Sequence, residues 1–92
     1  MALFEGAALA AALAALGIIL IVGIITLAVI RERLKNKDMF KAHIKQQSET
    51  LGVTVIHIDL EDSYGNSIDE VKLASVDGAN VTTGTVIYKS EL

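Results

Sequence analysis

The sequence predicts an α+β fold, in which one long N-terminal helix over about residues 3–50 carries a small three-stranded antiparallel β-meander. Three observations lead to this fold. Residues 6–30 contain no charged side chain, whereas residues 31–92 carry every Lys and Arg. Residues 31–50 contain neither Gly nor Pro and are rich in helix-forming residues. After Gly52, runs of β-branched residues alternate with turn-forming residues.

The length and composition bound what the chain can be. Its 92 residues allow one domain at most. We expect three segments: an apolar helix over residues 1–30, a basic helical extension over 31–51 and a β-module over 52–92. The absence of cysteine excludes a disulfide scaffold, a cysteine nucleophile and thiolate metal sites. The chain has two histidines, so few side chains are suited to catalysis or to zinc binding.

The uncharged segment over residues 6–30 predicts a membrane-spanning helix. Twenty-five helical residues reach roughly 37 Å, which exceeds the hydrocarbon core of a bilayer at about 30 Å. A cleavable secretory signal fits less well, because no basic residue precedes the segment and the apolar run is too long. The segment is therefore predicted to cross a membrane.

Small residues in the first half of this segment predict contacts between helices. Alanine predominates from residue 6 to residue 17. Small side chains four residues apart let two helices approach closely in lipid, and leucines at 4-3-4 spacing suit knobs-into-holes packing. The alternative is an ordinary lipid-facing anchor. We predict packing against copies of the same chain, through Gly6, Ala10, Leu13 and Ala14.

The first five residues carry a family resemblance. Met1-Ala2-Leu3-Phe4-Glu5, followed at once by a long apolar segment, resembles the mature N-terminus of type IV pilins, and Met at the first position is closest to the type IVb branch. The resemblance implies a prepilin trimmed by a leader peptidase, an unbroken helix with a small sheet packed on its C-terminal half, and Glu5 paired with a neighbour's Met1 amine. The alternative for Glu5 is a carboxylate in the headgroup layer at a helix N-terminus.

The stretch over residues 31–50 predicts a basic continuation of the helix. It holds six Lys and Arg against three acidic residues, and Gly52 is expected to end the helix. The basic residues fit either a topology signal that keeps this end in the cytoplasm or a membrane collar that contacts anionic lipid. The first alternative opposes the orientation that the pilin resemblance implies. The collar consists of Arg31, Arg33, Lys35 and Lys37.

The last forty residues predict three strands. Residues 53–60 place Ile56, Ile58 and Leu60 on one face, with Val53, Val55, His57 and Asp59 on the other. Turn residues over 63–66 and at Asp77-Gly78 separate this strand from further strands over 68–76 and 81–89. Such a module is too small for an independent core, so we expect it to pack on the helix or on other subunits.

Motifs for chemistry are weak. The acidic residues around Gly65 fail the register of an EF-hand, and His43 and His57 have no partner at metal-ligand spacing. The sequence contains neither a nucleophile elbow nor a phosphate-binding loop. Little aromatic interleaving in the basic cluster argues against nucleic acid. Asn80-Val81-Thr82 is a glycosylation sequon if the module is extracellular. We expect no catalytic or metal residue, no cofactor and no small-molecule substrate.

The sequence therefore predicts a non-enzymatic structural subunit of a pilus-like extracellular filament. The subunit would be membrane-inserted before assembly and would self-assemble through its hydrophobic helix, so its partners would be copies of itself and a lipid membrane. Two alternatives remain open. One is a small single-span protein of a membrane-containing virus capsid, located in the virion membrane. The other is an accessory subunit of a membrane complex.

Overall fold

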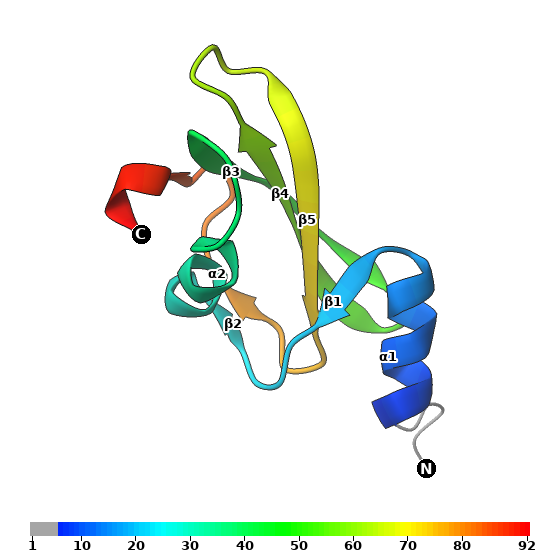
Figure 1. The fold of residues 1–92 in the computed structure, drawn as a ribbon. Helices are drawn as coiled ribbons and strands as arrows, with labels where there is room; N and C mark the ends of the chain where they lie inside the picture. The colour runs from blue at the N-terminus through cyan, green and yellow to red at the C-terminus, as the bar shows by residue number, and fades with distance from the viewer. Residues whose placement is uncertain (1–5) are drawn as a thin grey trace.

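The computed structural model describes residues 6–92, which form a twisted five-stranded sheet with one helix on each face (Figure 1). The molecule is elongated, with principal extents of 47 × 23 × 21 Å. The elements are α1 (Gly6–Ala15), β1 (Ile18–Leu20), β2 (Ile25–Thr26), α2 (Leu27–Leu34), β3 (Lys41–Thr50), β4 (Val53–Glu61), β5 (Ser67–Ser75), β6 (Ala79–Asn80), β7 (Val86–Tyr88) and a 3-10 turn (Lys89–Glu91).

The main sheet has the strand order β1-β5-β4-β3-β7. Strands β3, β4 and β5 form its antiparallel centre, and β7 pairs antiparallel with β3. β1 pairs in parallel with β5 at the opposite edge, with Ile19 opposite Leu73. A bulge between Ile44 and Gln46 leaves Lys45 as an extra residue in β3. Strands β2 and β6 form a separate two-stranded parallel ladder.

The prediction of one long N-terminal helix is wrong. α1 ends at Ala15, and the N–H of Gly17 donates to the carbonyl of Ala14 at 2.9 Å in its last turn. Gly17 has φ 76°, a left-handed conformation that ends a helix and that glycine adopts without a Cβ penalty. The next residues, Ile18 and Ile19, are β-branched and enter a strand instead.

The predicted membrane-spanning half is not formed within residues 6–92. None of the helices in this part of the chain combines the length and the apolar character needed to cross a bilayer. The apolar run turns a second time at Gly23, where φ is 87°. Its Ile21, Ile25 and Ile30 are buried in the protein's own core. These side chains are therefore buried against the sheet and not, as predicted from the sequence, in lipid.

The basic helical extension is also wrong. α2 begins after Thr26, whose Oγ1 accepts the N–H of Val29 at 3.3 Å, and it ends at Leu34. The following segment is β3, whose residues Lys41 to Ile44 alternate between half-buried and buried side chains. A strand is favoured here because β3 pairs with β4 along its full length, a partner that the local helix propensity does not anticipate.

The predicted β-module is correct in its first two strands and wrong in its third. β4 and β5 form a hairpin through the predicted turn, and Ile56, Ile58 and Leu60 of β4 lie buried on one face as expected. The predicted meander fails after β5. The Asp77-Gly78 turn leads to β6, which pairs with β2, and the last strand pairs with β3 rather than with β5.

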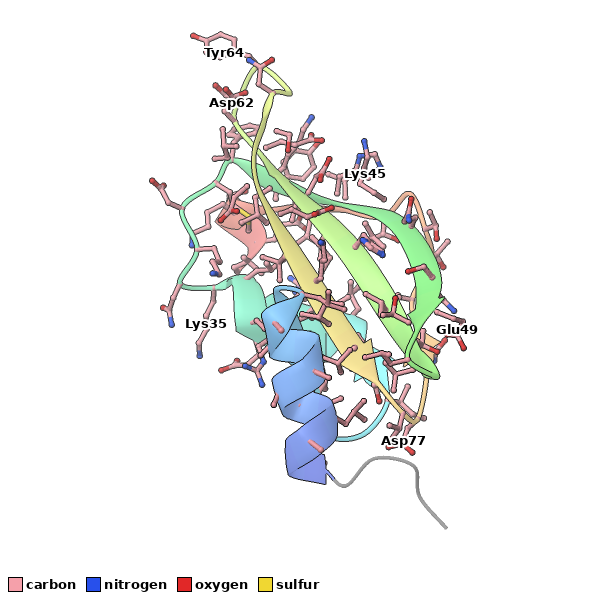
Figure 2. All side chains as sticks on the ribbon, turned by 90° about the vertical axis from the view of Figure 1, so that its right-hand side faces the viewer. Lys35, Lys45, Glu49, Asp62, Tyr64 and Asp77 are labelled. Atoms are coloured by element: carbon pink, nitrogen blue, oxygen red, sulfur yellow. The ribbon has the colours of Figure 1, made fainter. Side chains whose placement is uncertain are left out.

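Two hydrophobic clusters pack on opposite faces of the sheet. The larger cluster lies under α2 and joins the inner faces of β3, β4 and β5 to Ile30 and Leu34 of the helix. The smaller cluster lies under α1, where Leu9 and Leu13 contact Val53 and Val55 of β4. Because α1 is short, it covers one end of its face and leaves the rest open (Figure 2).

Candidate functional site

The open face of the sheet beyond α1 is lined by charges of both signs (Figure 2). Because side chains alternate along a strand, every second residue of β3, β4 and β5 points to this face. Three lysines pair with three carboxylates, two of them across neighbouring strands and one within β5, so the face is close to neutral. These residues are Lys41, Lys45, Lys72, Asp59, Glu61 and Glu70.

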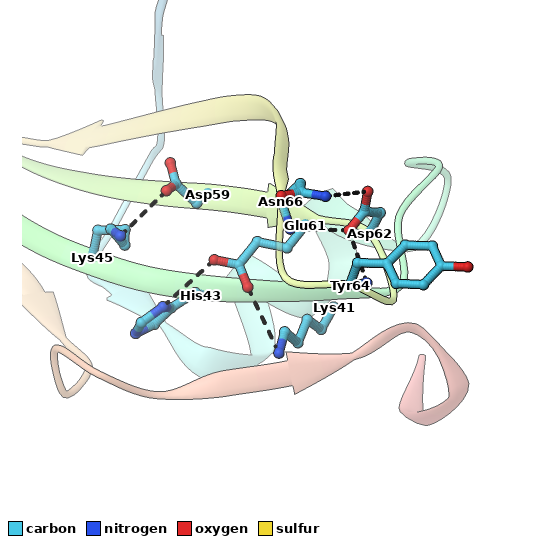
Figure 3. Close-up of polar contacts among 8 residues, drawn as sticks. All are labelled: Lys41, His43, Lys45, Asp59, Glu61, Asp62, Tyr64 and Asn66. Carbon is cyan, nitrogen blue, oxygen red and sulfur yellow. Dashed lines mark hydrogen bonds and ion pairs between the residues drawn. The ribbon is translucent and has the colours of Figure 1, made fainter.

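Glu61 is the most buried carboxylate of this face, with 8% of the residue exposed. Its Oε1 lies 3.8 Å from Lys41 Nζ and its Oε2 lies 3.8 Å from His43 Nδ1 (Figure 3). Lys45, which the bulge adds to β3, lies 3.5 Å from Asp59. Cross-strand pairs of opposite charge contribute about 0.2–1 kcal/mol each, so these contacts stabilise the register of β3 against β4.

Ser48, His57 and Glu70 resemble a nucleophile, base and orienting acid. Ser48 Oγ lies 2.8 Å from His57 Nε2, and His57 Nδ1 lies 4.0 Å from Glu70 Oε2. A hydrolytic site also needs a cavity for substrate and donors aimed at an oxyanion. The surface grooves near α2 are lined by other residues. The three side chains fit a cross-strand polar ladder better than a catalytic site.

The β4–β5 hairpin projects from the far end of the sheet and is ordered by Asp62. The backbone N–H groups of Asn66 and Tyr64 donate to Asp62 Oδ1 at 2.9 Å (Figure 3). These bonds, of which the one from the Asn66 backbone has the largest effect, hold the pKa of the Asp62 carboxyl below its ordinary value. Tyr64 at the tip is 88% exposed and points away from the sheet.

At the opposite end of the molecule, the loop between β1 and β2 carries only apolar side chains and glycine, with the exposed Asp77 in the neighbouring turn after β5. Val22 is 99% exposed, in the loop that joins β1 to β2. We call this region the N-terminal apolar surface and define it by its exposed residues Leu16, Ile19, Val22, Ile24 and Leu27. An open groove of about 460 Å³ lies beside it, lined by Leu20, Ile21, Val22, Ala28, Val29, Glu32 and Arg33.

The two edges of the sheet are protected differently. At the β7 edge, the N–H of Tyr88 donates to Glu91 Oε1 at 2.9 Å, so a side chain of the same chain satisfies it. At the other edge, β1 pairs on one side with β5, and the sheet ends there within residues 6–92. Natural proteins usually protect such an edge with charge, proline or a covering element. β1 consists of Ile18, Ile19 and Leu20 and has none of these side-chain features.

The predicted assembly residues lie in two environments. Met1 and Glu5 fall outside the part of the chain that the structure describes. Gly6, Ala10, Leu13 and Ala14 all lie in α1. Ala14 is exposed and Ala10 is half-buried, whereas Leu13 is fully buried in the cluster between α1 and the sheet. Leu13 is therefore part of this protein's own core.

The predicted collar residues surround the C-terminal half of α2. Arg31 donates to the backbone carbonyl of Glu91 at 2.9 Å, and Lys35 pairs with Glu32 at 2.8 Å. Arg33 lines the groove beside Val22. The backbone carbonyl of Lys37 accepts a bond from Lys89 Nζ at 2.6 Å. Asn80, the predicted glycosylation position, is exposed in β6.

Comparisons with known proteins place the chain in no family. No family model, curated protein or solved structure matches it. The interpretation as a pilin that forms a pilus filament is wrong in the feature it required, because residues 6–92 hold two short helices and a mixed sheet instead of one long helix. The Met1–Glu5 motif that carried the resemblance lies outside these residues.

The open edge and the exposed loop were not predicted from the sequence. Both lie in the run predicted to form a single helix. A usable signal was present, because Gly17 and Gly23 bracket a short apolar run that begins with two isoleucines. A run of this length between glycines is consistent with a buried strand as well as with a helix.

Proposed function

We propose that this protein is a non-enzymatic structural subunit that associates with copies of itself through its N-terminal apolar surface. The observation that carries the proposal is the exposure of Val22, Ile24 and Ile19 around an edge strand that lacks charge. Several large apolar side chains exposed in one region of a protein often mark a site of association. Covering these side chains removes apolar area from water and favours complex formation.

The distribution of charge favours a second copy as the partner. The chain carries a formal charge of -3, and residues 52–92 hold two basic against seven acidic residues. Two identical acidic molecules repel each other unless they meet through an uncharged region. The loop that carries Val22 and the acidic β4–β5 hairpin lie at opposite ends of the molecule in Figure 1. Contact through the N-terminal apolar surface therefore keeps the two acidic hairpins apart.

Sedimentation equilibrium over a wide concentration range tests this proposal. We expect the wild-type protein to associate, and Val22→Asp or Ile24→Asp to shift it toward monomer. Burying an aliphatic side chain contributes about 1.5–3 kcal/mol to association. Each change should therefore raise the dissociation constant at least about tenfold. Tyr64→Asp, which introduces the same charge at the exposed hairpin tip, is the matched control. A wild-type protein that stays monomeric throughout contradicts the proposal.

A second candidate partner is an anionic lipid surface. The observation that favours it is the position of Arg33, which lines the apolar groove together with Val22 and Val29. Residues 31–37 hold four basic residues and one acidic residue, and such clusters bind anionic headgroups. Flotation with phosphatidylserine vesicles tests it, with phosphatidylcholine vesicles and Arg33→Glu as controls. Equal flotation with both lipids contradicts a role for the basic residues.

A further inference from the structure

The backbone of β1 presents a set of hydrogen-bonding groups at the edge of the sheet. The N–H of Ile21 donates to the carbonyl of Ala74 in β5 at 2.7 Å. Backbone groups alternate sides along a strand, so Ile19 also directs its N–H and C=O toward β5. Ile18 and Leu20 then direct theirs away from the sheet. One donor and one acceptor on each residue form a self-complementary pattern.

The side chains that flank β1 on the two faces of the sheet are small or apolar. α1 packs on one face of the sheet through its Leu9 and Leu13 side chains, and the exposed positions of α1 are alanines. Ile19 points to the opposite face, where it is 40% exposed. No charged residue occurs from residue 6 to residue 30, so β1 and the segments that flank it in the sequence contribute no like charge to a contact at this edge. At the β7 edge, the N–H of Tyr88 already donates to the side chain of Glu91.

We propose that two copies pair through β1 in antiparallel orientation, about a two-fold axis at Ile19. The pairing rests on the proposed function, because it specifies how the N-terminal apolar surface associates. When the two-fold axis passes at Ile19, Ile18 of each copy lies opposite Leu20 of the other copy, and the two residues exchange both of their backbone hydrogen bonds. The two Ile19 side chains then meet across the axis. The result is one continuous sheet with an isologous interface.

Site-specific disulfide formation tests the register. The chain has no cysteine, so Ile19→Cys introduces a single thiol. Residues opposite each other in a non-hydrogen-bonded antiparallel pair have Cα atoms about 4.5 Å apart, within the range that a disulfide needs. We expect Ile19→Cys to form a covalent dimer on mild oxidation. Val86→Cys on β7, where the wild-type residue is 38% exposed, is the matched control at the other edge and should stay monomeric.

Amide hydrogen exchange of the wild-type protein gives a second readout without any substitution. The Ile18 and Leu20 amides should exchange more slowly at concentrations where the protein associates than after dilution. Association without this protection, with Ile19→Cys and Val86→Cys cross-linking equally, overturns the β1 pairing and leaves the proposed function standing. A protein that remains monomeric contradicts both.

Discussion

The Oγ of Ser75, at the end of β5, donates a hydrogen bond to the backbone carbonyl of Gly23, in the loop between β1 and β2. The same oxygen accepts the N–H of Asp77 at 3.0 Å. Ser75 is fully buried, so these contacts are shielded from water. They tie the loop that carries Val22 to the turn that follows β5.

Ser75→Ala should lower the free energy of unfolding by about 1–3 kcal/mol, because it leaves the buried partners without a hydrogen bond. Urea unfolding followed by circular dichroism measures the change. Ser63→Ala in the exposed hairpin turn is the control and should have little effect. If the two variants unfold at the same urea concentration, the Ser75 contacts do not stabilise the loop.

Gly17→Ala distinguishes the turn after α1 from a continuous helix by the sign of its effect. At φ 76° an alanine suffers a left-handed strain of roughly 1–2 kcal/mol, so the protein should become less stable. In the interior of a helix the same change would stabilise by about 1 kcal/mol. Thermal unfolding of the variant against the wild type measures the sign. A raised midpoint would contradict the turn.

Leu13→Ala tests whether Leu13 serves the core. Its side chain is fully buried between α1 and the sheet, and such truncations cost about 2–5 kcal/mol. Leu16→Ala, at the half-exposed end of the same turn, should cost much less. Denaturant unfolding of both variants, with association measured in parallel, separates the two roles. A stable Leu13→Ala variant that fails to associate would instead place Leu13 in the interface.

The Asp62 turn should give the hairpin a pH dependence. The pKa of Asp62 is lower in the folded than in the unfolded chain, so its carboxylate stabilises the fold at every pH above the unfolded value. This contribution is lost as the pH falls through the lowered folded value. Carbon-detected NMR titration of the carboxyl group measures the pKa. Asp62→Ala should remove that part of the acid dependence while leaving the rest of the curve unchanged.

Local sequence patterns were sufficient for part of the fold. The alternation of Ile56, Ile58 and Leu60 with polar residues fixes which face of β4 is buried, because strand side chains point to opposite faces. The turn chemistry around Gly65 likewise places the hairpin. The polar ladder on the open face follows from the same alternation, but its pairing across β3, β4 and β5 needs a register that spans distant residues.

The sequence by itself determined that residues 6–30 contribute uncharged, mostly apolar side chains, and that residues 31–92 contribute all of the Lys and Arg side chains. Only the tertiary structure decided whether that apolar run spans as a helix or folds back at Gly17 and Gly23 into the sheet. Apolar side chains are stabilised by leaving water, whether the surroundings are lipid, another subunit or the chain's own core. An apolar run therefore shows that its side chains must be buried, whereas the strands β4 and β5, distant in the sequence, determine where in the structure they are buried.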